Sequence, residues 1–124
     1  MKETKKINSY KDLIVWQKGM DLAVMVCKVT ANFPKNELYS LTSQMRRAAT
    51  SIVSNIAEGK GRDSKPEYLH FLAISEGSLC ELETQILLSV RLNYLGETDS
   101  KTLLELCDEI GRMLTTLRSK LKVV

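Results

Sequence analysis

Apolar residues recur at alternating spacings of three and four in four segments of this chain. That period places side chains on one face of an α-helix, so four amphipathic helices are predicted. The helices span about residues 10–32, 38–59, 65–94 and 99–122. The predicted core positions are Leu13, Trp16, Met20, Ala23, Cys27 and Thr30 in the first helix, Leu41, Met45, Ala48, Ile52 and Ile56 in the second, Leu69, Leu72, Leu79, Leu82, Ile86 and Val90 in the third, and Leu103, Cys107, Ile110, Leu114, Leu117 and Leu121 in the fourth.

Helix breakers and capping residues predict where these helices end. Pro34 ends the first helix, because the residue before a proline is disfavoured in the α region. Gly59 and Gly96 end the second and third, and Gly59 suits the left-handed C-cap conformation. Ser64 is the predicted N-cap of the third helix, with the Glu67 carboxylate reaching back to the Ser64 amide.

The spacing of the helices predicts the fold class. Connections of about five residues favour antiparallel neighbours, so an all-α, antiparallel up-down-up-down four-helix bundle is expected. It forms a single domain over residues 1–124, with a flexible basic N-terminal arm at 1–8 that carries Lys2, Lys5 and Lys6. Gly77 interrupts the third helix, where glycine costs about 1 kcal/mol relative to alanine. Close contact with another helix, within the bundle or across subunits, would offset this cost.

The composition is typical of a soluble globular protein, with 44% hydrophobic and 27% charged residues among 124. No apolar run approaches the roughly 20 residues of a membrane-spanning helix, and no secretory signal is visible. Cys27, Cys80 and Cys107 lack metal-ligand spacing and are interpreted as small buried hydrophobic residues in a reducing compartment. A cytoplasmic protein with no membrane association is therefore expected.

Charge is distributed unevenly although the net charge is only +3. Residues 66–90 hold four glutamates and no lysine or arginine. Residues 35–65 instead hold six bases against three acids, and residues 112–122 hold four bases and no acid. Basic segments of this kind can contact nucleic-acid phosphates. The candidate nucleic-acid-binding residues are Arg46, Arg47, Lys60, Arg62, Arg112, Arg118, Lys120 and Lys122.

Structural interpretations of the same basic residues remain open. Arg46 and Arg47 can instead form ion pairs with Glu76 or Glu83, between helices or between subunits. The Gly-rich segment around Lys60 can equally be a helix C-cap followed by a flexible turn.

Signals for an enzyme are weak. His70 is the only histidine, and its Glu-x-x-His spacing from Glu67 matches half of a di-iron helix-bundle motif. A second such motif cannot exist in a chain with one histidine. No phosphate-binding or cofactor motif is present, so no catalytic residue, metal or cofactor is expected.

Several sequence blocks together point to a family. They are Asp12 to Gln17, Ser43 to Ile52, Ser54 to Gly59, and Glu76 to Thr84. This combination resembles the four-helix-bundle proteins encoded by intervening sequences inside bacterial 23S ribosomal RNA genes. Two positions depart from the family pattern, in which a glycine often stands at Ser40 and a proline at Val53.

The resemblance implies a homo-oligomer with five-fold ring symmetry. It also implies kinship with the accessory variability determinant of diversity-generating retroelements, a pentameric bundle that binds nucleic acid and a reverse transcriptase. The function expected is a non-enzymatic oligomer that binds structured RNA or other nucleic acid through basic surfaces of the ring. The alternative is a protein-interaction scaffold, for a reverse transcriptase or a ribosome-associated factor, without nucleic-acid contact.

Overall fold

The structure is a computed structural model that describes residues 8–122. Those residues form four long helices, α1 (Ile14–Thr30), α2 (Leu41–Lys60), α3 (Lys65–Arg91) and α4 (Glu97–Lys122), with short 3-10 helices at Tyr10–Asp12 and Lys35–Glu37. The described part of the chain contains no strand. The predicted all-α four-helix bundle is confirmed. The basic arm with Lys2, Lys5 and Lys6 lies outside the described residues, except for Asn8.

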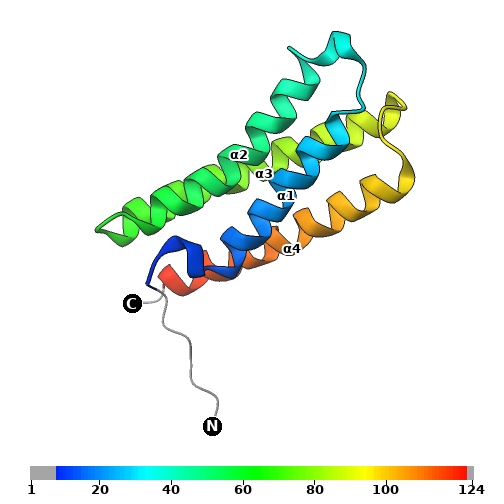
Figure 1. Cartoon of the computed structure of the whole chain (residues 1–124). Coiled ribbons are helices and arrows are strands. Elements are labelled where there is room, and N and C mark those ends of the chain that lie inside the picture. Colours follow the sequence, from blue (N-terminus) through cyan, green and yellow to red (C-terminus); the bar gives the residue numbers. More distant parts are fainter. Residues whose placement is uncertain (1–7, 123–124) are drawn as a thin grey trace.

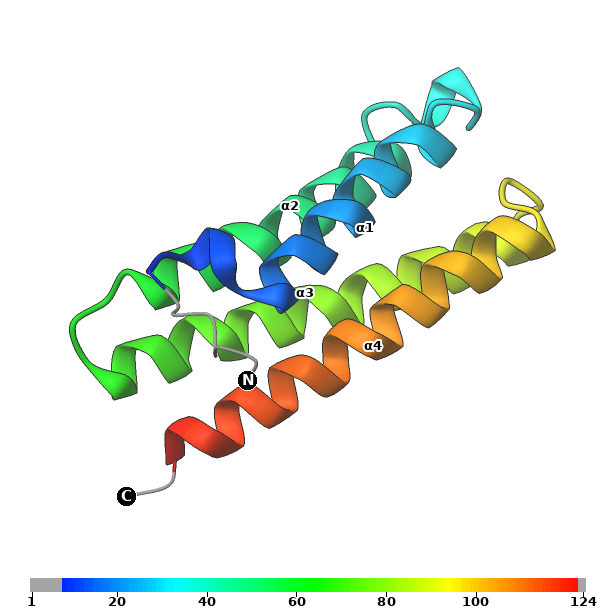
Figure 2. The same cartoon turned by 60° about the horizontal axis from the view of Figure 1, so that its bottom comes forward.

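The four helices form a bundle in which each helix packs against two others. α1 and α3 each contact α2 and α4. Figures 1 and 2 show that the α2–α3 connection, the start of α1 and the last turn of α4 lie at one end of the bundle, here called the terminal end. The α1–α2 and α3–α4 connections lie at the other, here called the distal end.

The core follows the predicted faces of three helices. All five predicted positions of α2 are buried, and Leu72, Leu79, Leu82 and Ile86 of α3 are buried with them. In α4 the buried residues include Leu103, Cys107, Ile110 and Leu114. Leucine and isoleucine at three- and four-residue spacing therefore identified these faces correctly.

The buried face of α1 differs from the predicted one. Val15, Gly19, Leu22 and Val26 are buried, together with the predicted Thr30. The predicted Leu13, Trp16 and Ala23 are partly buried against the core, whereas the predicted Met20 and Cys27 are exposed. The true stripe lies one residue before the predicted one, a rotation of about 100° around the helix axis. Both stripes of α1 are apolar, so periodicity alone did not separate them.

Small residues bring α2 and α3 close together. Ser75 Oγ donates to the carbonyl oxygen of Ile52 at 2.9 Å, and the hydroxyls of Ser51 and Ser78 lie 2.8 Å apart. A Cβ added at Gly59 would stand 3.0 Å from Phe71 Cβ on α3. Glycine at 59 therefore serves the contact between the two helices.

Two helix ends differ from the prediction. Gly59 lies inside α2, which continues to Lys60, and no described glycine has positive φ. Asn93, with φ of 62°, takes the left-handed position after α3, where Gly96 was expected to act. Asparagine tolerates this conformation because its short polar side chain bonds locally.

The N-cap of α3 is confirmed at Ser64, whose Oγ accepts from the Glu67 amide at 3.3 Å. The reciprocal bond differs from the expected one, because the Glu67 carboxylate accepts from the Ser64 hydroxyl rather than from its amide. A reciprocal capping box instead forms at Ser9 and Asp12, and α1 begins at Ile14 after an extended Leu13.

The cysteines do not share one environment. Cys107 is buried, and desolvation together with nearby Glu83 raises the pKa of its thiol to about 12. Cys27 and Cys80 are exposed, so their prediction as buried residues was wrong. Cys27 lies on the solvent side of α1, one residue after the buried Val26.

Candidate nucleic-acid interface

The fold brings two of the predicted basic segments together. Lys60 and Arg62 belong to the end of α2 and its connection to α3, and Arg118, Lys120 and Lys122 belong to the last turns of α4. Both segments reach the terminal end of the bundle (Figures 1 and 2). Alternating helix direction therefore joins cations that are far apart in sequence.

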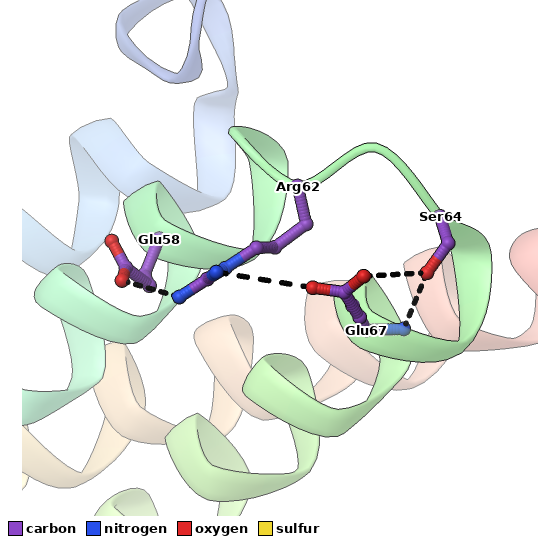
Figure 3. Close-up of polar contacts among 4 residues, drawn as sticks. All are labelled: Glu58, Arg62, Ser64 and Glu67. Carbon is purple, nitrogen blue, oxygen red and sulfur yellow. Dashed lines mark hydrogen bonds and ion pairs between the residues drawn. The ribbon is translucent and has the colours of Figure 1, made fainter.

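Arg62 is held by neighbouring side chains (Figure 3). Its guanidinium lies 2.7 Å from the Glu58 carboxylate and 3.8 Å from that of Glu67. It also lies over the Phe71 ring, 4.7 Å from the centroid. The Ser64 hydroxyl orients Glu67 for this contact. Arg62 thus links the end of α2 to the first turns of α3, which leaves it few donors for a phosphate.

Arg118 is also engaged within the bundle. Its Nη1 donates to Glu76 Oε2 at 2.9 Å, and the two side chains are 29% and 28% exposed. Within the described residues, Arg118 Nε and Glu76 Oε1 are buried without a hydrogen-bond partner. Glu76 therefore pairs with Arg118 of α4. The structural interpretation offered from the sequence had instead paired Glu76 with Arg46 or Arg47.

Arg46 contacts the end of α1. Its Nε donates to Thr30 Oγ1 at 3.0 Å, and Thr30 in turn donates to the Val26 carbonyl oxygen at 2.6 Å. A cation beside a helix C-terminus is stabilised by the carbonyl dipoles there. Arg46 is a structural residue, although its partner is a helix end instead of the predicted carboxylate.

Arg47 differs from its neighbour. It is exposed and has no hydrogen bond or ion pair within residues 8–122. It lines an open groove of about 640 Å³ on the outside of α2, together with Leu38 and Tyr39. It also borders a polar groove of about 500 Å³ between α2 and α3, where Glu81 lies. The ion pair of Arg47 with Glu76 or Glu83, the structural alternative left open by the sequence, is absent from the described residues.

The predicted basic residues therefore do not form one surface. Arg47 precedes Lys60 by thirteen residues of α2, a separation of about 20 Å along the helix. Arg112 forms an exposed i,i+4 pair with Asp108 at 3.2 Å. At the terminal end, Lys60, Lys120 and Lys122 form no ion pair with any described residue.

Lys65 is a cation of the terminal end that sequence reasoning missed. It is exposed in the first turn of α3 and forms no ion pair among the described residues. Its place beside Lys60 follows from the short α2–α3 connection, which was the signal available in the sequence.

The described residues offer no metal centre. No group of three His, Cys, Asp or Glu side chains in residues 8–122 is arranged to hold a metal ion. His70 is exposed on α3. No helix among these residues is both long and apolar enough to cross a membrane.

Comparison with known families decides where this chain belongs. The family model of the 23S rRNA-intervening sequence proteins matches residues 11–116. The chain belongs to this family. Among solved structures, it resembles a protein of unknown function of the S23 ribosomal protein family from Bacteroides thetaiotaomicron, with a TM-score of 0.77 and 23% identity over 85% of this chain and 98% of that one. Comparison with curated proteins gives no match. The match confirms the family resemblance that the Arg-Arg-Ala and Asn-Ile-Ala-Glu-Gly blocks of this 23S rRNA-intervening sequence protein indicated.

Proposed function

We propose that this 23S rRNA-intervening sequence protein is a non-enzymatic oligomer, a five-fold ring, that binds structured RNA or another nucleic acid. The terminal end of each protomer supplies the contacts, through Lys60, Lys65, Lys120 and Lys122. The observation that carries the proposal is that these lysines share one end of the bundle and have no ion pair among the described residues. Lysines free of partners can replace the counterions of a phosphate backbone.

Oligomerisation strengthens this proposal. A net charge of +3 for one chain becomes about +15 in a ring of five. Repeated weak phosphate contacts then act together, so their combined affinity exceeds that of any single protomer. Arg46, Arg62 and Arg118 contribute little in this proposal, because each is engaged by its own bundle.

The test is fluorescence anisotropy of a labelled structured RNA, titrated with nuclease-treated protein at several salt concentrations. Steep loss of affinity with salt is expected, and the slope estimates the number of phosphate contacts. The double variant Lys60→Glu with Lys120→Glu removes two of the proposed phosphate contacts from each protomer. The slope of log affinity against log salt concentration should therefore correspond to about two fewer contacts for each protomer that binds the RNA.

A matched control carries the same charge change at the distal end. Lys35 and Lys101 are exposed in the 3-10 helix before α2 and in the first turns of α4. Lys35→Glu with Lys101→Glu should leave the salt slope nearly unchanged. Equal losses in both double variants would mean that only net charge matters, and the terminal end would not be the binding site. No binding by the unmodified protein at low salt would leave the scaffold function as the better proposal.

A further inference from the structure

A groove of about 770 Å³ lies between the first turn of α1 and the last turns of α4, near the terminal end of the bundle (Figures 1 and 2). Its volume falls in the range of sites that bind small organic molecules. The apolar side chains that line it are Leu13, Ile14, Val15, Met113 and Leu117. The polar residues that line it are Asp12, Gln17, Arg112, Thr116 and Lys120. We call it the α1–α4 groove.

The apolar lining combines a buried floor with an exposed wall. Val15 is buried, and Leu13, Met113 and Leu117 are partly buried and pack against the core. Ile14 is 60% exposed, more than the other large apolar residues of α1. A large apolar side chain at the edge of an apolar groove is stabilised when a second apolar group covers it. The groove therefore favours a ligand with a hydrocarbon body.

Hydrogen bonds fix the α1 side of the groove. The Gln17 side-chain amide donates to the Lys11 carbonyl oxygen at 2.9 Å, which ties the 3-10 helix at Tyr10–Asp12 to α1. Leu13 is extended between these two helices, with ψ of 123°, and its side chain packs against the core. A wall that is already formed lowers the entropic cost of binding a ligand.

The charges around the groove favour an anionic group. Lys120 forms no ion pair with any described residue, and Arg112 pairs with Asp108 in a mostly exposed contact. Asp12 is the one acidic residue among those that line the groove, and its carboxylate accepts from two backbone amides of the preceding turn. α1 begins at the groove without a side-chain cap, so the positive end of its dipole has the same sign as the two cations.

The cation and the apolar strip follow one line along α4. Met113, Leu117 and Lys120 recur at spacings of four and three, which places them on one face of the helix. The seven residues from Met113 to Lys120 span about 10 Å along the helix axis. A cation therefore stands at the end of an apolar strip, and this order matches a molecule with a hydrocarbon tail and one anionic head.

We propose that the α1–α4 groove binds a free single-chain anionic amphiphile, a long-chain carboxylate, with its tail along Met113 and Leu117 and its head at Lys120. The inference does not depend on the proposed function, although both use Lys120. A nucleic-acid strand is the poorer occupant of the groove, because apolar side chains offer a phosphate no hydrogen-bond donor.

The first experiment is equilibrium dialysis of the full chain against decanoate, below the concentration at which decanoate forms micelles. Saturable binding is expected. Dodecanoate should bind about tenfold more tightly and octanoate about tenfold more weakly, because each buried methylene contributes about a factor of four. Decanol has a similar tail without the charge and should bind about fivefold more weakly than decanoate, as expected for the loss of an exposed ion pair. Decyltrimethylammonium, with a cationic head, should bind more weakly still.

Variants then locate the site. Ile14→Asp places a charge in the apolar wall and should weaken decanoate binding by about tenfold or more. Val24→Asp is the matched control, because Val24 is an apolar residue of α1 that is 51% exposed and lies outside the groove. It should change decanoate binding by less than about twofold. Both residues face solvent, so helical content by circular dichroism should be unchanged. Lys120→Met keeps an apolar stem, and it should weaken decanoate binding by about fivefold and leave decanol binding unchanged.

Several outcomes would overturn the inference. They are no saturable binding of decanoate, equal binding of decanoate, decanol and decyltrimethylammonium, normal binding by Ile14→Asp, or an equal loss in Val24→Asp. Binding to vesicles of anionic phospholipid without binding of free decanoate would assign the groove to a membrane surface instead. RNA anisotropy on the same samples separates the two proposals. A chain that binds decanoate and ignores RNA removes the proposed function and leaves this site, and a chain that binds RNA and ignores decanoate does the reverse.

Discussion

At the scale of single residues, Arg118 is a cation that forms an ion pair within the bundle rather than one left free to bind a ligand. Its guanidinium and the Glu76 carboxylate lie 2.9 Å apart, and each side chain is less than a third exposed. Removing one member of such a pair leaves the other charge half-buried without its partner, which is costly. Removing both can be nearly neutral.

Arg118→Met is therefore expected to lower the free energy of unfolding by about 1–3 kcal/mol in urea titrations. The double variant Arg118→Met with Glu76→Met should recover most of this loss. Arg112→Met is the control, because Arg112 and its partner Asp108 are 75% and 69% exposed, and it should cost less than about 0.5 kcal/mol. Unchanged stability together with weaker RNA binding in Arg118→Met would return Arg118 to the phosphate-binding residues.

At the scale of elements, a carboxylate joins two connections at the distal end. Tyr94, after α3, donates its hydroxyl to Glu37 Oε2 at 2.7 Å, and its ring lies 5.4 Å from that of Phe33. Hydrogen bonds from Ser40 and then Tyr94 lower the pKa of Glu37 below its ordinary value of 4.5. A carboxyl with a lowered pKa stabilises the fold above its ordinary pKa, and this stabilisation is lost as pH falls through the folded pKa.

Tyr94→Phe should raise the pKa of Glu37 toward 4.5, as followed by NMR titration of the side-chain carboxyl. The acid-side loss of stability below about pH 4.5 should then become shallower in urea titrations at stepped pH. Ser40→Ala should raise the pKa further, because the bond from Ser40 is the larger cause. An unchanged Glu37 pKa in both variants would mean that neither hydroxyl holds this carboxylate in solution.

The elements also reveal which parts of the fold were predictable. The faces of α2 and α4 follow one strong apolar stripe each, and periodicity identified them. The face of α1 was wrong because Val15, Leu22 and Val26 compete with an equally apolar stripe beside them. The close approach of Gly19 to Val53 accompanies the buried stripe, since a Cβ at position 19 would stand 2.5 Å from Val53 Cγ1.

The candidate site was predictable only in part, for a related reason. Chain direction alone places Lys60 and Lys120 at one end, so sequence could anticipate that cluster. The partners of Arg46 and Arg118 depend on the rotation of each helix about its axis, which apolar periodicity fixes only coarsely. A pairing of arginine with Glu76 was anticipated, but the arginine comes from α4.

At the scale of the whole molecule, the surface divides into regions with different chemistry. At the terminal end, Lys60, Lys65, Lys120 and Lys122 form no ion pair with any described residue, whereas residues 66–90 of α3 carry four glutamates and no lysine or arginine. In the proposed five-fold ring, cyclic symmetry would place the terminal end of every copy on the same side. The lysines of all copies could then contact one nucleic acid together.

The three cysteines supply a test of the packing of the whole bundle. Cys27 is exposed on α1, Cys80 is exposed on α3, and Cys107 is buried with a thiol pKa of about 12. In the folded protein, a thiol reagent should modify Cys27 and Cys80 quickly and Cys107 only after unfolding in urea, because the thiolate is the reactive form and the Cys107 thiol is buried. Mass spectrometry of peptides after timed labelling gives each rate. Modification of Cys107 in the folded protein at the rate of Cys27 would mean that the bundle opens around α4 without global unfolding.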